Sequence, residues 1–132
     1  MTIEYPYKRI LVTGGCGFIG SSYIQNILRY YDDIEVQNID LMTYATSKKT
    51  LELLTEYKNF SHLTLDISKF LEIEGAINSF GPDLIVNFAA ESHVDNSIEG
   101  ALPFMSTNIL GVFNLLEISK NLISRNDKKF LF

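Results

Sequence analysis

Cysteine and histidine are scarce in this 132-residue sequence, which contains one cysteine, Cys16, and two histidines, His62 and His93. A single cysteine excludes an intrachain disulfide and a cysteine-based metal cluster. The two histidines fall in different predicted segments, which is a poor basis for a metal site. We therefore expect no metal centre. The lack of disulfides fits a reducing compartment and predicts a cytoplasmic location.

Basic residues are outnumbered by acidic ones. The 11 Lys and Arg residues against 16 Asp and Glu residues give a net charge of −5, and the pI is about 4.9. A general binder of nucleic-acid phosphates needs a basic face, so this balance argues against a nucleic-acid partner. It does not exclude a single nucleotide whose phosphates are held by backbone amides.

Long hydrophobic runs are missing as well. The first nine residues include Glu4, Lys8 and Arg9, which argues against a signal peptide. No stretch reaches the ~18 consecutive apolar residues of a membrane span, so we expect no membrane association. Apolar residues still make up 46% of the chain, which is enough for a packed core. The length predicts one domain over residues 1–132.

Short apolar runs alternate with segments of helical periodicity. The patterns predict strands at residues 8–13, 35–40, 60–65, 83–89 and 129–132, and helices at 18–30, 48–57, 70–80 and 107–125. This alternation predicts the α/β class, with a doubly wound parallel sheet. Because the chain stops within the last apolar run and no helix follows to cover it, we expect a fold that is incomplete at the C-terminus.

The first predicted strand leads into a glycine-rich loop, Gly14-Gly15-Cys16-Gly17-Phe18-Ile19-Gly20. Glycines at this strand–helix junction let the backbone approach a pyrophosphate at the helix N-terminus. Asp40 ends the second predicted strand, 20 residues after Gly20. A carboxylate there accepts hydrogen bonds from a ribose diol and repels a 2′-phosphate, which favours NAD over NADP. The alternative is a tight turn with an exposed aspartate.

We interpret Cys16 as a small filler rather than a redox thiol.

Longer motifs resemble a known family. Residues 13–21 are similar to the loop of extended short-chain dehydrogenases/reductases. Residues 40–45 (DLMTYA), 66–67 (DI), 87–98 (NFAAESHVDNSI) and 107–111 (TNILG) resemble segments of dTDP-glucose 4,6-dehydratases. The likeness covers residues 9–132, and the run ESHVD is its most specific part. Asn96, where the family usually has arginine, departs from the pattern, and Met42, Phe88 and Ser106 are milder differences.

This resemblance implies a Rossmann-type NAD-binding domain and assigns its site residue by residue. It places the pyrophosphate turn at Gly14, Gly17, Phe18, Ile19 and Gly20. The adenosine ribose is expected at Asp40, Leu41, Met42 and Thr43, and the adenine beside Asp66 and Ile67. The nicotinamide side is expected at Phe88, Ala89, Ala90, Glu91, Ser92 and Thr107. Ser92 and His93 would face the sugar nucleotide.

The resemblance also implies an activity for the full-length protein, which would be a homodimer that removes water from dTDP-glucose through transient reduction of NAD. In the family, a Tyr–Lys pair and an Asp–Glu pair that move protons lie beyond the start of the fifth strand. We therefore assign no catalytic residue, and we expect this stretch to lack the substrate domain and to be inactive alone. Tyr44 and Lys48 have the Tyr–Lys spacing but fall in the loop on the adenosine side. The alternatives are a nucleotide-sugar epimerase or decarboxylase of the same superfamily, and a non-catalytic NAD-binding or partner-binding module.

The residues by themselves leave some points open. Glu91, His93 and Asp95 fit a solvated loop better than a site when the resemblance is set aside. Thr107 and Asn108 fit a helix cap as well as a ligand contact. Gly111, inside a predicted helix, fits close packing beside a cofactor or a tolerated surface glycine.

Overall fold

The computed structural model describes residues 4–44, 46–92, 98, 100–125 and 131–132. Strands and helices alternate along the described chain, as the sequence predicted. They are β1 (Arg9–Thr13), α1 (Phe18–Tyr30), β2 (Glu35–Ile39), α2 (Lys48–Leu54), β3 (Phe60–Leu63), α3 (Phe70–Phe80), β4 (Leu84–Asn87), α5 (Ala101–Met105), the π-helical turn η1 (Ser106–Gly111) and α6 (Val112–Arg125).

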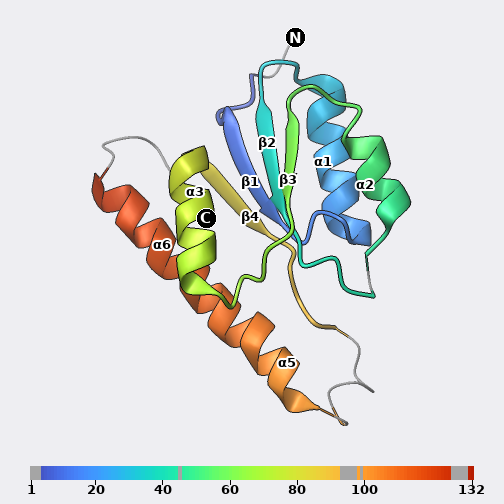
Figure 1. Ribbon diagram of the computed structural model, residues 1–132. Coiled ribbons are helices and arrows are strands. Elements are labelled where there is room, and N and C mark those ends of the chain that lie inside the picture. The colour runs from blue at the N-terminus through green and yellow to red at the C-terminus, as the bar shows by residue number, and fades with distance from the viewer. Residues whose placement is uncertain (1–3, 45, 93–97, 99, 126–130) are drawn as a thin grey trace.

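The strands form one parallel sheet in the order β3-β2-β1-β4. Thr13 at the end of β1 pairs with Ile39 of β2 on one side and with Asn87 of β4 on the other, so the three strands end level. The chain runs outward from β1 to β3 and then crosses back to β4 beyond β1 (Figure 1). This confirms the doubly wound parallel sheet. The reversal between β1 and β4 creates the switch point outside which open α/β sheets bind ligands.

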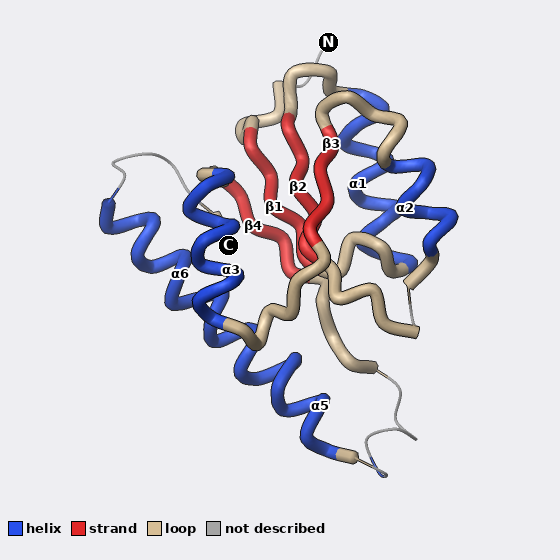
Figure 2. The backbone as a smooth tube through the Cα atoms, in the orientation of Figure 1, coloured by secondary structure: helices blue, strands red, loops and turns tan. Residues whose placement is uncertain are grey.

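Helices cover both faces of the sheet, with α1 and α2 on one side and α3 and α6 on the other (Figure 2). Successive side chains of β1 divide between two cores, because side chains alternate along a strand. Ile10 and Val12 join the core under α1, and Leu11 joins the core under α3 and α6. The apolar strands are therefore buried on both faces, as expected for a parallel sheet.

Several predicted boundaries differ from the observed ones. Helix α3 ends at Gly81, whose φ of 63° is left-handed, so the predicted stop at Gly81-Pro82 is confirmed. Strands β3 and β4 are shorter than predicted, ending at Leu63 and Asn87, and α2 ends at Leu54. From the expected strand at 129–132, Leu131 pairs with Leu84, while residues 129 and 130 lie outside the described residues.

The last helix begins earlier than predicted. It starts at Ala101 rather than Thr107, with Pro103 in its first turn, where a missing N–H costs no helical hydrogen bond. Thr107 and Asn108 lie in the π-helical turn, inside the helix, so the interpretation of these residues as an N-terminal cap is wrong. Single π-helical turns are rare and frequently occur at functional sites.

Residues Ala101–Arg125 form a helix of 25 residues with a mean hydropathy of 1.3 in its most apolar window. By length and composition alone this helix could cross a membrane, whereas the sequence predicted no membrane span. A single helix of this kind is weak evidence for a membrane span. In this structure 22% of the window is buried. Leu115, Ile118 and Leu122 are buried and pack in the core with α3 and the sheet.

The buried amide of Asn114 joins α6 to the loop after β3. Its Nδ2 donates to the carbonyl of Ile67 at 3.0 Å. We expect Asn114→Ala to lower the free energy of unfolding by about 1–3 kcal/mol, because it leaves that carbonyl unpaired. Ser124→Ala, which removes an exposed hydroxyl bonded to Lys120 in the same helix, serves as the control and should change stability by less than about 0.5 kcal/mol. Urea unfolding measures the free energy of unfolding of both variants. Equal losses in Asn114→Ala and Ser124→Ala would contradict a role for the Asn114 contact.

Candidate functional site

The loop after β1 lies in close contact with the ends of the neighbouring strands. Gly14 has a left-handed φ of 69°, and its N–H donates to the Ile39 carbonyl at 2.9 Å. A Cβ on Gly14 would lie 2.5 Å from the Ala89 nitrogen and 2.6 Å from the Phe88 carbonyl carbon. Both the conformation and the space therefore require glycine here.

The start of α1 is packed against the same loop. A Cβ on Gly20 would lie 2.8 Å from the Gly15 Cα and would also strike the Gly14 carbonyl oxygen. Gly17 is the N-cap of α1 and has no side chain to cap the first N–H groups. The N-terminus of α1 is thus available for an anion, as the glycine pattern predicted. Phe18 and Ile19 lie in the first turn and are exposed.

Asp40 holds two loops together at the end of β2. Its side chain is buried, and its two carboxylate oxygens accept hydrogen bonds from the Cys16 N–H at 2.9 Å and the Met42 N–H at 2.8 Å. Met42 has a left-handed φ of 59° beside this contact. A carboxylate offers about four acceptor positions, so Asp40 keeps acceptor capacity for further donors. The alternative of an exposed aspartate after a simple turn is wrong.

The loop after β3 forms the opposite wall. Asp66 Oδ1 accepts from the Ser68 N–H at 2.8 Å, which shapes the turn into α3. Ile67 is buried, and a Cβ on Gly111 would lie 2.5 Å from its side chain. Gly111 is therefore needed for close packing of the helix against this wall, and the surface-glycine alternative is wrong.

The π-helical turn supports the segment after β4. Asn108 makes a paired contact with the Glu91 backbone: its Nδ2 donates to the Glu91 carbonyl and its Oδ1 accepts from the Glu91 N–H, both at 2.9 Å. Tyr44 Oη donates to Glu91 Oε2 at 3.1 Å from the loop after β2. Glu91 is thus held from two elements far from it in sequence. The interpretation of Asn108 from the sequence, as a helix cap or a ligand contact, did not include this support of Glu91, for which its position beside Thr107 was the available signal.

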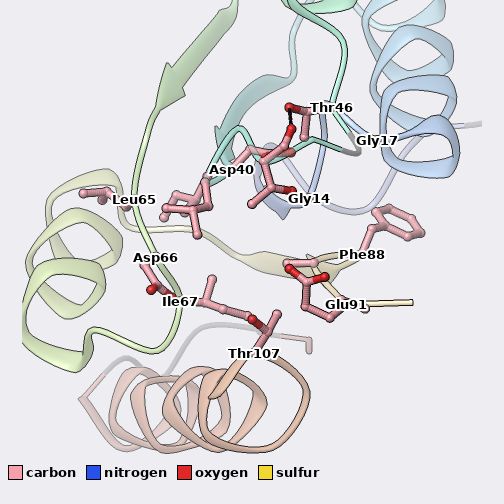
Figure 3. Close-up of a pocket in the computed structure, with 15 residues that line it drawn as sticks. Gly14, Gly17, Asp40, Thr46, Leu65, Asp66, Ile67, Phe88, Glu91 and Thr107 are labelled. Atoms are coloured by element: carbon pink, nitrogen blue, oxygen red, sulfur yellow. Dashed lines mark hydrogen bonds between the residues drawn. The ribbon is translucent and has the colours of Figure 1, made fainter. Parts of the chain in front are cut away.

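These elements enclose one pocket, which opens at the carboxyl edge of the sheet (Figure 3). In the figure Gly14, Asp40 and Thr46 lie across it from Asp66, Ile67 and Thr107, with Phe88 and Glu91 at one side. Residues predicted for the site that line the pocket are Gly14, Gly17, Asp40, Leu41, Thr43, Asp66, Ile67, Phe88, Ala89, Ala90, Glu91 and Thr107. Three lining residues were not predicted from the sequence, namely Ile39, Thr46 and Leu65.

Other predicted site residues do not line this pocket. They are Phe18, Ile19, Gly20, Met42 and Ser92. Gly20 and Met42 shape its walls through the contacts described above. His93 lies outside the described residues, as does Asp95.

Cys16 is buried in the glycine-rich loop, where Asn38 Nδ2 donates to its sulfur at 3.3 Å. Burial, followed by the nearby Asp40 carboxylate, raises the pKa of the Cys16 thiol to about 12. The thiolate is the reactive form, so this cysteine is inert at neutral pH. This geometry supports the interpretation of Cys16 as a filler.

Tyr44 and Lys48 do not share a helix despite their spacing. Tyr44 lies in the loop after β2, while Lys48 begins α2 behind the Ser47 cap, whose Oγ accepts from the Thr50 N–H at 3.2 Å. In the part of the chain that the structure describes, no group of three or more His, Cys, Asp or Glu residues could hold a metal ion.

Comparison with known proteins places these features in context. Residues 11–132 match the family model described as GDP-mannose 4,6 dehydratase. A dTDP-glucose 4,6-dehydratase of Haemophilus influenzae is 43% identical over 112 residues, which are 85% of this chain and 33% of that protein. The chain spans about a third of the length of the curated relatives it matches.

Two solved structures show the same fold. DesIV, a dTDP-glucose 4,6-dehydratase from Streptomyces venezuelae solved with NAD bound, has a TM-score of 0.77 and 38% identity, covering 86% of this chain and 36% of its own. The UDP-Glc/GlcNAc 4-epimerase of Campylobacter jejuni has a TM-score of 0.78 and 29% identity, covering 87% of this chain and 34% of its own.

Two helical glycines provide a matched test of the loop packing. Gly20→Ala should lower the free energy of unfolding by about 1–3 kcal/mol, because its methyl group meets the backbone of the glycine-rich loop. Gly75→Ala in α3 meets no atom within 4 Å and should stabilise the protein by about 0.5–1 kcal/mol. Chemical denaturation measures the free energy of unfolding of both variants. A change of the same sign in Gly20→Ala and Gly75→Ala would contradict the close approach at Gly20.

Proposed function

The chain belongs to the GDP-mannose 4,6-dehydratase family, and on that premise we propose that it is the NAD-binding part of a dTDP-glucose 4,6-dehydratase. The observation that carries the proposal is the pocket at the switch point. It brings together the glycine-rich loop, Asp40, the turn at Asp66 and the segment around Glu91. Relatives named as dTDP-glucose 4,6-dehydratases match nearly all of the chain, which supports this choice within the family.

The residues present fit a dinucleotide. The N-terminus of α1, whose N-cap is Gly17, would hold the pyrophosphate, because its first N–H groups have no side-chain cap. Asp40 would accept hydrogen bonds from the adenosine ribose and repel a 2′-phosphate, which favours NAD over NADP. The apolar surface of Leu65 and Ile67 suits a flat base, and Asp66 flanks it. NAD, when bound, supplies hydride transfer.

The chain's own residues act by binding and orientation in this proposal. Asn108 holds Glu91 and the segment before it, so the wall formed by Phe88, Ala89 and Ala90 is supported by the π-helical turn. Thr107, in the same turn, would contact the nicotinamide side. We assign no proton-transfer residue in this stretch and propose that the proton-transfer groups and the substrate domain lie elsewhere in the full-length protein.

The proposal carries further expectations for the full-length protein, namely a dTDP-sugar substrate, a cytoplasmic location and a homodimer. An apolar helix face supports self-association. On the helix formed by α5, η1 and α6, large apolar side chains are exposed at Leu102, Met105, Ile109, Phe113 and Leu116. Exposed apolar surface of this kind marks interaction sites.

An assay of the full-length natural protein tests the activity. We expect dTDP-glucose to be converted into a product that has lost one water and carries a keto group at C4, as followed by mass spectrometry and NMR. The epimerase alternative, which has the same fold in the C. jejuni structure, predicts a product of unchanged mass with inverted configuration at C4. Conversion of UDP-glucose into its C4 epimer, with dTDP-glucose left intact, would overturn the proposal.

Asp40→Asn tests the cofactor assignment. We expect NAD⁺ binding, measured by calorimetry on the full-length protein, to weaken by about tenfold to a hundredfold, because the amide is uncharged and offers one acceptor oxygen in place of two. Asp33→Asn makes the same charge change before β2, in an exposed pair with Lys8, and should leave binding unchanged. Thermal unfolding of both variants separates lost binding from lost folding. NAD⁺ binding that is unaffected in a folded Asp40→Asn protein would contradict this role.

A further inference from the structure

A chain of polar side chains runs beneath the glycine-rich loop, on the face of the sheet that packs against α1. Asn38, in the middle of β2, is fully buried and lies in register between Val12 of β1 and His62 of β3. Its Oδ1 accepts from the Gly15 N–H at 2.9 Å. Its Nδ2 is 3.3 Å from the Cys16 sulfur and 3.1 Å from His62 Nδ1.

Hydrogen-bond chemistry determines the orientation of every group in this chain. The Gly15 N–H can only donate, so the amide oxygen of Asn38 must face it. The amide nitrogen then faces His62 Nδ1, and because an NH₂ group only donates, Nδ1 must accept and carry no proton. His62 Nε2 therefore carries the ring proton. It donates a hydrogen bond to Thr64 Oγ1 at 3.1 Å. The contacts define one neutral tautomer of His62.

Protonation of His62 conflicts with this arrangement, because a proton on Nδ1 would point at the donor group of Asn38. Rotation of the Asn38 amide would relieve the conflict but would remove the acceptor from the buried Gly15 N–H. Rotation of the imidazole away would instead leave an Asn38 N–H unpaired. Either route loosens the contact that holds the glycine-rich loop against β2, since a buried unpaired polar group is costly.

We propose that His62 is a positioning residue for the dinucleotide site: in its neutral form it holds Asn38, Asn38 holds Gly15, and protonation of His62 weakens dinucleotide binding. The inference rests on the proposed function for its ligand, NAD⁺. The contacts that carry it are independent of any ligand.

The surroundings of His62 favour its neutral form at neutral pH. Burial, the larger effect, lowers the pKa of His62 below its usual 6.5, and the Asp40 carboxylate at the end of β2 opposes this by raising it. From the glycine-rich loop, the Cys16 thiol contributes no charge, because its pKa is about 12. Asn38 and Thr64, on β2 and after β3, are uncharged. The midpoint of the imidazole titration therefore lies below pH 6.5.

The test compares His62→Asn with the natural protein in NAD⁺ binding at about pH 7.5 and at a pH about one unit below the midpoint of the His62 titration, which NMR of the natural protein measures, using the full-length chain. Asparagine offers a non-titrating oxygen to the Asn38 amide. The natural protein should bind NAD⁺ about threefold to tenfold more weakly at the lower pH, as expected for the loss of one hydrogen bond. His62→Asn should keep its affinity at both pH values. His62→Leu, which has no acceptor, should bind more weakly at both.

Ser61→Ala serves as the control, since Ser61 is exposed, precedes His62 on β3 and bonds to Gln37 rather than Asn38. It should reproduce the pH profile of the natural protein. Circular dichroism at both pH values verifies that each variant is folded. A His62→Asn profile as steep as that of the natural protein would overturn the proposal.

A second measurement needs no NAD⁺. With glycine and histidine labelled for NMR, the Gly15 amide shift of the natural protein should follow the titration of His62 with the same midpoint. In His62→Asn the Gly15 shift should be constant over that range. If the natural protein fails to bind NAD⁺ at all, the proposed function falls while this titration still decides the role of His62. Gly15 and His62 titrating independently would overturn that role.

Discussion

The close approach of the loop after β1 to the ends of its neighbouring strands is the contact on which the rest of the structure depends. Gly14 touches the backbone at Phe88 and Ala89 of the segment after β4, and Gly20 brings the start of α1 against the same loop. A methyl group at either glycine would push these backbones apart. Because the approach is so close, the N-terminus of α1 opens directly onto the switch point of the sheet.

Buried polar groups hold that loop in place from beneath. Asn38 on β2 accepts the N–H of Gly15, and Asp40, directly after β2, accepts the N–H of Cys16. Both side chains are buried, so leaving either acceptor unpaired would be costly, and this restrains the loop. A preorganised loop loses little conformational entropy on binding, which favours affinity for a ligand at this edge. Through Asn38 the arrangement extends to His62 on the next strand.

The other wall of the pocket depends on an irregularity in the last helix. The π-helical turn at 106–111 directs Asn108 to the backbone of Glu91, and Gly111 packs against Ile67. The same helix thus supports two walls that come from different strands. One face of this helix carries exposed apolar side chains. The opposite face buries Leu115, Ile118 and Leu122 in the core under the sheet.

The sequence by itself determined the order of elements, the glycine-rich loop and the place of Asp40, because these follow from local periodicity, backbone freedom and the end of a strand. Only the tertiary structure decided the pairing of Asn38 with His62 and of Asn108 with Glu91. Each pair joins residues that strand order and helix packing bring together. Local sequence patterns predict neither the strand order nor the start of the last helix. The positions of Thr46 and Leu65 in the pocket wall were missed for the same physical reason.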